Sequence, residues 1–353
     1  MKKSTKQIIT VCLAAVLITG IFSGCSTAKK ATGSTVLNVI CWSEYLPQSV
    51  LNSFRKDTGI KVNMTTYNSP DEMLTKVQSA KKGTYDMVIC PGMYVTIFNK
   101  LGMINKLETS KIPNHKNLNP QYLSQAYDPK NEYSYPYMCA SAVIAVDRSK
   151  IKDKITGYQD LLNPKYKNSM VVIEDSRAVV GMAEMDTGHG INDTSAKALS
   201  DAQSYLLKLK PNIKVFDGAS PKTEMINGEC PLGLIYGAEA ALAMKQKKSI
   251  EVIYPKEGVY FGADVMMTFK GGKNTDNAYK LINDILDAKV SASISDIFPY
   301  ANPNKAAYAY LPASYKNNMA ENVPADVLKR TQNLMDIGTA TSKIDAIWSK
   351  VKG

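Results

Sequence analysis

Four consecutive residues near the start of the chain combine aromatic rings, a hydroxyl group and a carboxylate. Trp42, Ser43, Glu44 and Tyr45 come directly after the apolar run 36–41 (VLNVIC). Aromatic faces attract cations, and a carboxylate can pair with an ammonium group whose burial would otherwise be costly. Because open α/β sheets bind ligands beyond the ends of their strands, this segment predicts a site for an organic cation.

Two of these side chains also have a structural interpretation. Trp42 could belong to the core, and Glu44 could be an acid favoured by the helix dipole ahead of Pro47. A further candidate, Asp264, interrupts the otherwise apolar run 261–267 (FGADVMM). A carboxylate in apolar surroundings needs a partner, which a cationic ligand would supply.

Motifs for catalysis and metal binding are missing from the sequence. It contains no G-x-S-x-G, no H-E-x-x-H and no phosphate-binding loop. The two histidines, His115 and His189, could in principle belong to a hydrolase triad, but no surrounding motif supports one. Without a CxxC pair, no zinc site is predicted. A ferric site held by paired tyrosines is a further alternative, although no two tyrosines are adjacent. We therefore expect no enzyme, no metal and no other cofactor, and keep an extracytoplasmic hydrolase as the alternative from another class.

The elements that would position these residues alternate along the chain. Apolar, strand-like runs lie at 36–41, 60–67, 86–90, 141–146, 170–173, 250–254 and 265–269. Helical spacing occurs at 47–58, 70–80, from 94 onward, 178–185, 196–209 and 277–288, and Ser69 is a good capping residue for the second of these helices. This alternation predicts α/β lobes with largely parallel sheets, and about 330 residues are enough for two lobes with a ligand-binding cleft.

The first residues of the chain have the order of an export signal. A basic start with three lysines precedes the apolar run 8–21, which is followed by the small-residue tetrapeptide 22–25 (FSGC). We expect a lipoprotein signal peptide at 1–24, a lipid-modified Cys25 and a flexible tether at 25–35. An ordinary cleaved signal with an incidental cysteine is the alternative.

Charge and cysteine content limit the class of protein further. The formal charge is +11, and it becomes +8 without the three lysines of the leader, which has no acids. The lysines are dispersed, whereas a nucleic-acid binder would show a basic stripe. The remaining cysteines are Cys41, Cys90, Cys139 and Cys230. Export permits disulfides, but the apolar runs around these cysteines favour buried free thiols.

A series of short motifs resembles spermidine/putrescine-binding proteins, the extracellular receptors of polyamine ABC importers. The motifs are 41–47 (CWSEYLP), 54–62 (FRKDTGIKV), 84–88 (TYDMV), 102–104 (GMI), 135–137 (YPY), 174–177 (EDSR), 254–258 (YPKEG) and 303–307 (PNKAA). The resemblance implies a two-lobed, periplasmic-binding-protein-like fold of type II, in which each lobe is a mostly parallel sheet flanked by helices. It also implies two hinge crossings, near Ala140 and Asp264. Lobe 1 would comprise 36–140 plus 264–311, and lobe 2 would comprise 141–263 plus 312–353.

The same resemblance implies roles for individual residues. Trp42 and Tyr45 would be stacking walls, and Ser43 and Glu44 would be polar anchors for one ammonium group. Further implied ligand contacts are Met93, Asp175, Tyr236, Asp264 and Tyr300. Asp175 could instead pair with Arg177, and the two tyrosines could be ordinary packing residues.

Several positions depart from the family pattern. Pro91 and Met93 stand where Ser and Tyr are common, and Ala178 stands where a second acid usually supports Asp175. Gly262 replaces a usual tryptophan wall, and Leu334 replaces a usual polar contact. We expect a thinner pocket near Asp175 and a roomier, softer one near Met93 and Gly262.

These features together predict a lipid-anchored receptor on the outer face of the cytoplasmic membrane. It would be a monomer that closes its lobes around a polyamine and presents it to ABC importer permease subunits, without binding nucleic acid. The alternative ligand is another organic cation or a zwitterion.

Overall fold

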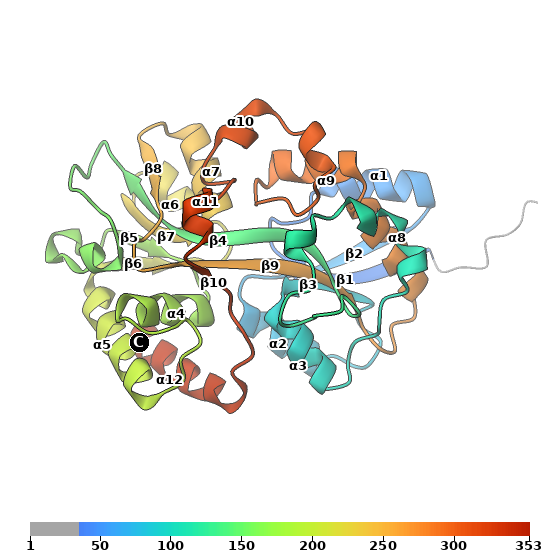
Figure 1. The fold of residues 1–353 in the computed structure, drawn as a ribbon, viewed down its shortest axis with the longest axis horizontal. Coiled ribbons are helices and arrows are strands. Elements are labelled where there is room, and N and C mark those ends of the chain that lie inside the picture. The colour runs from blue at the N-terminus through green and yellow to red at the C-terminus, as the bar shows by residue number, and fades with distance from the viewer. Residues whose placement is uncertain (1–34) are drawn as a thin grey trace, which may run out of the picture. The chain divides into compact units, whose positions relative to one another are not determined.

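In the computed structural model, which describes residues 35–353, ten strands form one hydrogen-bonded sheet (Figure 1). The strands are β1 (Val36–Trp42), β2 (Lys61–Tyr67), β3 (Met87–Pro91), β4 (Tyr135–Asp147), β5 (Met170–Val172), β6 (Ile213–Phe216), β7 (Leu232–Tyr236), β8 (Ile250–Ile253), β9 (Val259–Thr268) and β10 (Thr331–Gln332). The predicted signal peptide, Cys25 and residues 25–34 of the predicted tether lie outside the described residues.

Twelve α-helices within residues 35–353 cover this sheet. They are α1 (Gln48–Thr58), α2 (Pro70–Ser79), α3 (Met93–Lys100), α4 (Ser176–Asp186), α5 (Ala196–Leu209), α6 (Lys222–Ile226), α7 (Gly237–Gln246), α8 (Thr275–Ile285), α9 (Ala288–Ile297), α10 (Ala313–Asn317), α11 (Ala325–Leu328) and α12 (Thr341–Lys352). None of them is long and apolar enough to span a bilayer.

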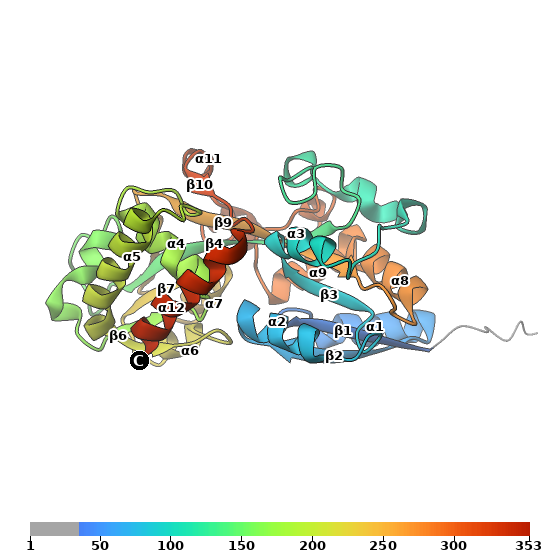
Figure 2. The same ribbon diagram turned by 90° about the horizontal axis from the view of Figure 1, so that it is seen from below.

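The order of the strands divides the sheet into two lobes. The main order is β2-β1-β3-β9-β4-β7-β5-β6, with β10 paired to β9 and β8 paired to β4. Parallel pairing joins β1, β2 and β3 at one end, and it joins β5, β6 and β7 at the other. We call these ends the first lobe and the second lobe (Figure 2). Each lobe is therefore a mostly parallel sheet, as the strand–helix alternation predicts.

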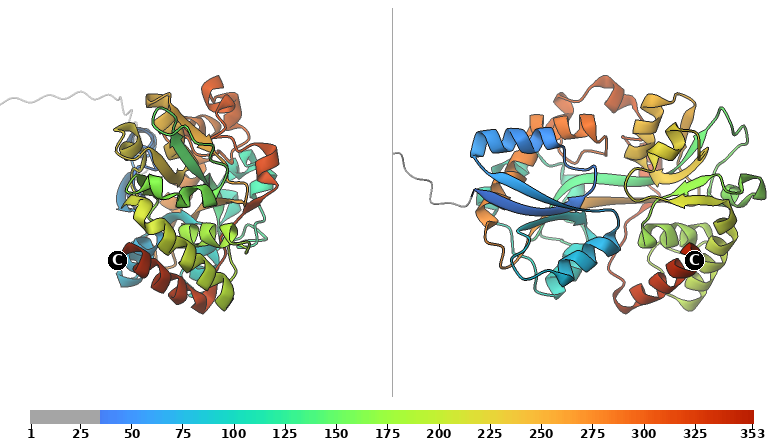
Figure 3. Two further views of the ribbon diagram at one scale, coloured as in Figure 1. Left: turned by 90° about the vertical axis from the view of Figure 1, so that its left-hand side faces the viewer. Right: turned by 180° about the vertical axis from the view of Figure 1, so that it is seen from behind.

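Helices lie on both faces of each lobe because the buried strands are apolar on both sides. In the first lobe, Leu37, Val39 and Cys41 face the cluster that includes α1, α8 and α9, whereas Ile40 faces the side covered by α2 and α3. In the second lobe, α4, α5 and α12 pack together, and α6 and α7 lie over the opposite face (Figure 3). All four cysteines of the described residues are buried free thiols, which confirms the prediction.

Two long antiparallel strands connect the lobes. β4 pairs with β9 up to Ser141 and with β7 from Ala142 onward. β9 pairs with β3 from Asp264 to Thr268, so it is shared with the first lobe. The predicted crossings near Ala140 and Asp264 fall beside these changes of partner. The side chain of Tyr315 in α10 packs with Ala292, Ala307 and Leu311, which ties α10 to the predicted lobe 1.

The structure corrects two predicted elements. The single helix expected at 277–288 is interrupted, because α8 ends at Ile285 and Asp287 caps α9 by accepting hydrogen bonds from the N–H groups of Lys289 and Val290. The apolar run 265–269 is only the second half of β9, which begins at Val259. By contrast, α5 has the predicted bounds, and Ser69 caps α2 by accepting a hydrogen bond from the Glu72 N–H at 3.2 Å.

Candidate functional site

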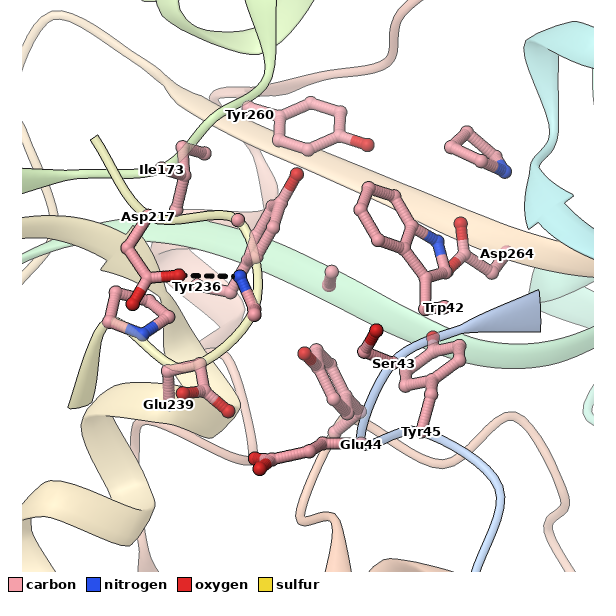
Figure 4. Close-up of a pocket in the computed structure, with 16 residues that line it drawn as sticks. Trp42, Ser43, Glu44, Tyr45, Ile173, Asp217, Tyr236, Glu239, Tyr260 and Asp264 are labelled. Atoms are coloured by element: carbon pink, nitrogen blue, oxygen red, sulfur yellow. Dashed lines mark hydrogen bonds between the residues drawn. The ribbon is translucent and has the colours of Figure 1, made fainter. Parts of the chain in front are cut away.

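A small cavity lies between the lobes, where the connections that follow several parallel strands meet (Figure 4). Its volume is about 30 Å³. It is lined by Trp42, Ser43, Glu44, Tyr45, Pro91, Ala140, Ile173, Asp217, Gly218, Ala219, Pro221, Tyr236, Glu239, Tyr260, Asp264 and Tyr300. Seven of the nine predicted ligand contacts are in this set, and Met93 and Asp175 are not.

The topology explains why residues so distant in sequence meet here. Trp42 ends β1 and Pro91 ends β3 in the first lobe. Asp217 follows β6 and Tyr236 ends β7 in the second lobe. Carboxyl ends of parallel strands share one edge of a sheet, so both lobes turn the same kind of edge toward the cavity. β4 and β9, which cross between the lobes, add Ala140, Tyr260 and Asp264 to the wall.

The aromatic residues of the segment 42–45 are fixed by ring contacts. Trp42 packs on Tyr67 with ring centroids 4.6 Å apart, and Tyr45 meets Tyr300 edge to face at 4.8 Å. Between them, Glu44 has a φ of 46°, a left-handed conformation that is uncommon for a residue with a side chain. Such strain of about 1–3 kcal/mol is typically kept where a side chain must be aimed. In this protein the strained backbone lies in the turn that brings the Glu44 carboxylate to the cavity.

The Glu44 carboxylate is paired with a lysine of the second lobe. Lys222 Nζ lies 2.8 Å from a Glu44 oxygen and 3.1 Å from a Glu239 oxygen. Lys222 also donates a hydrogen bond to the Ser220 hydroxyl at 2.8 Å. Glu239 is buried in the first turn of α7, and burial raises its pKa despite the pairing with Lys222.

Asp264 provides a carboxylate that has no ion-pair partner among residues 35–353. It is half-buried, and its carboxylate lies in the cavity wall, where it faces Trp42 and Tyr45 (Figure 4). Burial raises the pKa of Asp264 to about 7, and the nearby Asp175 carboxylate adds to the rise. The Tyr45 hydroxyl and the Trp42 indole N–H lower this pKa, although neither has a full hydrogen bond among the described residues.

The wall beside Asp264 differs from the one expected. Tyr260, Gly262 and Asp264 alternate along β9 and therefore share one face of the strand. A Cβ on Gly262 would lie 2.7 Å from the Tyr260 hydroxyl oxygen, so the Tyr260 ring covers the glycine. The Tyr260 ring therefore takes part of the space beside Gly262, and the expectation of a roomier, softer pocket near Met93 and Gly262 stays a prediction.

Asp175 lies behind the cavity wall and has two structural partners. It is 3% exposed, and it caps α4 by accepting a hydrogen bond from the Ala178 N–H at 2.9 Å. Its other oxygen accepts a hydrogen bond from the Tyr236 hydroxyl at 2.9 Å. Arg177 donates to Asn192 at 3.0 Å instead of pairing with Asp175. Asp175 therefore reaches the cavity through Tyr236, and its direct contact with a ligand stays a prediction.

Met93 lies in a second, smaller pocket that shares Pro91 and Tyr260 with the main cavity. Two further departures from the family pattern, Gly262 and Leu334, also line this second pocket, whereas Ala178 does not. The role of Met93 as a ligand contact stays a prediction.

Sequence reasoning missed four residues at or beside the cavity. Tyr260 could have been found from Asp264 by the two-residue alternation of a strand. Asp217 and Glu239 resemble ordinary turn and helix-start acids, and Asp217 does accept hydrogen bonds from the Ala219 and Ser220 N–H groups. Lys222 carries no local signal, because only the packing of α6 against α7 brings it to Glu239. Among residues 35–353, no cluster of three or more His, Cys, Asp or Glu side chains could hold a metal ion.

Comparison with known proteins places this geometry among transport receptors. The family model described as bacterial extracellular solute-binding protein matches residues 49–324. The spermidine/putrescine-binding periplasmic protein of Salmonella typhimurium is 34% identical over 327 residues, covering 92% of this chain and 94% of the relative. A solved protein of Listeria monocytogenes superposes with a TM-score of 0.86 at 27% identity, covering 90% of this chain and 99% of that one. The spermidine/putrescine ABC transporter substrate-binding protein PotD of Streptococcus pneumoniae superposes with a TM-score of 0.76 at 26% identity and the same coverage.

Proposed function

This chain belongs to the bacterial extracellular solute-binding protein family, and from that premise we propose that it is a lipid-anchored receptor that captures a polyamine for an ABC importer. The two-lobed periplasmic-binding-protein-like fold of type II is the one predicted. The relatives are solute-binding proteins of transporters, so the chain is a binding protein and not an enzyme. The polyamine, the lipid anchor at Cys25 and the permease partner belong to the proposal.

The observation that carries the proposal is the charge of the cavity lining. Four carboxylates line it, those of Glu44, Asp217, Glu239 and Asp264, and no lysine, arginine or histidine does, although Lys222 beside the lining neutralises part of the Glu44–Glu239 pair. Aromatic rings supply flat walls for methylene groups between them. Burying an ammonium group requires a carboxylate partner, and the unpaired carboxylate of Asp264 is available for this role. A zwitterion is disfavoured, because its carboxylate would lie among four acids and would find no cationic side chain in the lining, while Lys222 beside it is already paired with Glu44 and Glu239.

Contacts across the lobes indicate that the cavity is closed. Lys222 and Glu44 form their ion pair between the lobes, and the Ser176 hydroxyl donates to Asp71 across the same boundary at 3.2 Å. A volume of about 30 Å³ holds roughly two water molecules. A polyamine therefore requires the lobes to open and to close again around it, with bending at β4 and β9.

Calorimetric titration tests the proposed ligand class. Residues 26–353, which contain the whole compact unit 34–353, would be titrated with putrescine, cadaverine, spermidine and spermine, and with γ-aminobutyrate as a zwitterion of similar length. We expect saturable binding of at least one polyamine, with a rise in melting temperature and no turnover. Absence of binding to all four amines would refute the proposal that the ligand is a polyamine. Binding of only the zwitterion would identify a zwitterion as the ligand class instead.

A further inference from the structure

We propose that Lys222 is a specificity-determining residue: its ammonium group permanently occupies one cation position in the cleft and so limits how many ammonium groups a ligand can bring. This inference rests on the proposed function, because it concerns the ligand class of the same cavity.

The geometry around Lys222 is that expected for a bound amine. Its ammonium group has carboxylate oxygens of Glu44 and Glu239 within 2.8 Å and 3.1 Å, and the Ser220 hydroxyl at 2.8 Å. Three polar partners satisfy the three N–H groups of an ammonium ion. Figure 4 shows the Glu44 and Glu239 carboxylates approaching the same space, one from each lobe.

Burial makes this arrangement hard for a ligand to replace. The Lys222 side chain is 15% exposed and that of Glu239 is 6% exposed, so Glu239 would be left as an unpaired buried charge if Lys222 moved away. Burial alone would lower the pKa of Lys222, but the Glu239 and Glu44 carboxylates raise it above its ordinary value, which keeps the side chain cationic.

The position of Lys222 in the chain favours permanent occupancy. Lys222 begins α6, which packs against α7, and Glu239 lies in the first turn of α7. Lysine and glutamate are thus held by neighbouring helices of one lobe, whether or not the lobes are closed. Only Glu44 joins from the first lobe, and it is 52% exposed.

The consequence is a change in the charge available to a ligand. The pair Glu44 and Glu239 would carry two negative charges, of which Lys222 already neutralises one. The fourth carboxylate of the lining, that of Asp217, already accepts hydrogen bonds from the Ala219 and Ser220 N–H groups. A ligand therefore finds two uncompensated carboxylate charges, that of Asp264 and the remaining one of the Glu44–Glu239 pair. We expect the natural chain to prefer putrescine, with two ammonium groups, over spermidine, with three.

The test is a comparison of dissociation constants for putrescine and spermidine in Lys222→Met and in the unchanged chain. Lys222→Met keeps most of the side-chain volume and frees the carboxylate pair. The ratio of the two constants should shift toward spermidine by at least about tenfold, because the freed carboxylate pair can bind the third ammonium group of spermidine. Lys222→Arg, which retains the cation, should keep the ratio of the unchanged chain.

A matched control separates this effect from the loss of one positive charge on the protein. Lys214 also belongs to the second lobe and forms an ion pair with Glu229 at 2.9 Å, away from the cavity lining. Lys214→Met should leave the putrescine-to-spermidine ratio unchanged. If Lys222→Met fails to fold, Lys222→Gln carries the same test, with circular dichroism as the check on folding.

The outcomes are distinct. A shift of the ratio in Lys222→Met alone supports the inference. Polyamine binding with the same ratio in all variants overturns the inference and leaves the proposed function standing. If neither the unchanged chain nor Lys222→Met binds any amine, the proposed function fails and the inference fails with it.

Discussion

At the scale of single residues, we expect Asp264 to couple ligand binding to pH. Its pKa in the ligand-free chain is about 7, mainly because burial disfavours the charged form. An ammonium ligand pairs only with the ionised carboxylate. Affinity should therefore be constant above about pH 7 and fall below it, by up to about tenfold per pH unit. Titrations with putrescine between about pH 5.5 and about pH 8.5 check this, and the amine itself stays protonated throughout.

Asp264→Asn should remove both the affinity and its pH dependence. An unchanged affinity profile in this variant would show that the Asp264 carboxylate does not meet the ligand.

The same carboxylate should lower the stability of the ligand-free protein. The pKa in the folded state, about 7, exceeds the unfolded value of about 3.9. The contribution of Asp264 to stability is thus present at low pH and lost as the pH rises from about 4 to about 7. We expect Asp264→Asn to raise the melting temperature at about pH 8 by roughly 2–6 °C while abolishing binding.

An exposed acid provides the control for that measurement. Asp276 pairs with Lys111 at 2.8 Å, and this pairing lowers its pKa. Asp276→Asn should therefore give no increase in melting temperature. An equal increase in both variants would point to net charge as the cause.

At the scale of elements, the loop between β6 and α6 must come very close to the first lobe. A Cβ on Gly218 would collide with the backbone carbonyl oxygen of Asn68. Gly218→Ala should therefore hold the lobes apart and weaken polyamine binding by about tenfold or more, because contacts that form only on closure would be lost. Small-angle scattering with saturating ligand should show a larger radius of gyration than for the unchanged chain.

Gly190→Ala is the matched control for this glycine. A Cβ at Gly190 would lie at an ordinary 3.6 Å from Gln332, and we expect normal closure and binding. Full closure of Gly218→Ala would show that the contact with Asn68 is not required.

The elements that sequence reasoning predicted well are those whose patterns are local. The helix α5 shows the 3.6-residue period, and β1 and β3 are short apolar runs, so their own residues determine their type. β9 was only half predicted, because Gly262 and Asp264 interrupt the apolar pattern of its half-buried middle. Asp264 lines the cavity, so its charge serves the site and not the strand. Glu239 and Lys222 could not be predicted from the sequence either, because their pairing depends on packing between helices.

At the scale of the whole molecule, the two lobes share one sheet instead of being joined by loose linkers. Closure must bend β4 and β9, whose pairing continues through the crossing from Tyr135–Met266 to Ser141–Phe261. A hinge of this kind allows rotation between the lobes while it keeps each lobe rigid. The predicted two-lobed architecture follows from length and alternation alone, but the continuity of the sheet could not be seen from the sequence.

The four buried thiols have a practical consequence. Burial raises the pKa of Cys41, Cys90 and Cys139 well above the ordinary value for a thiol, and it suppresses the thiolate form that reacts with maleimides. A single cysteine introduced on the rim of the cleft would thus be labelled alone in folded residues 26–353. A fluorophore placed there would report lobe closure as a change in brightness. The native chain is thereby already suited to conversion into an optical sensor for the amine it binds.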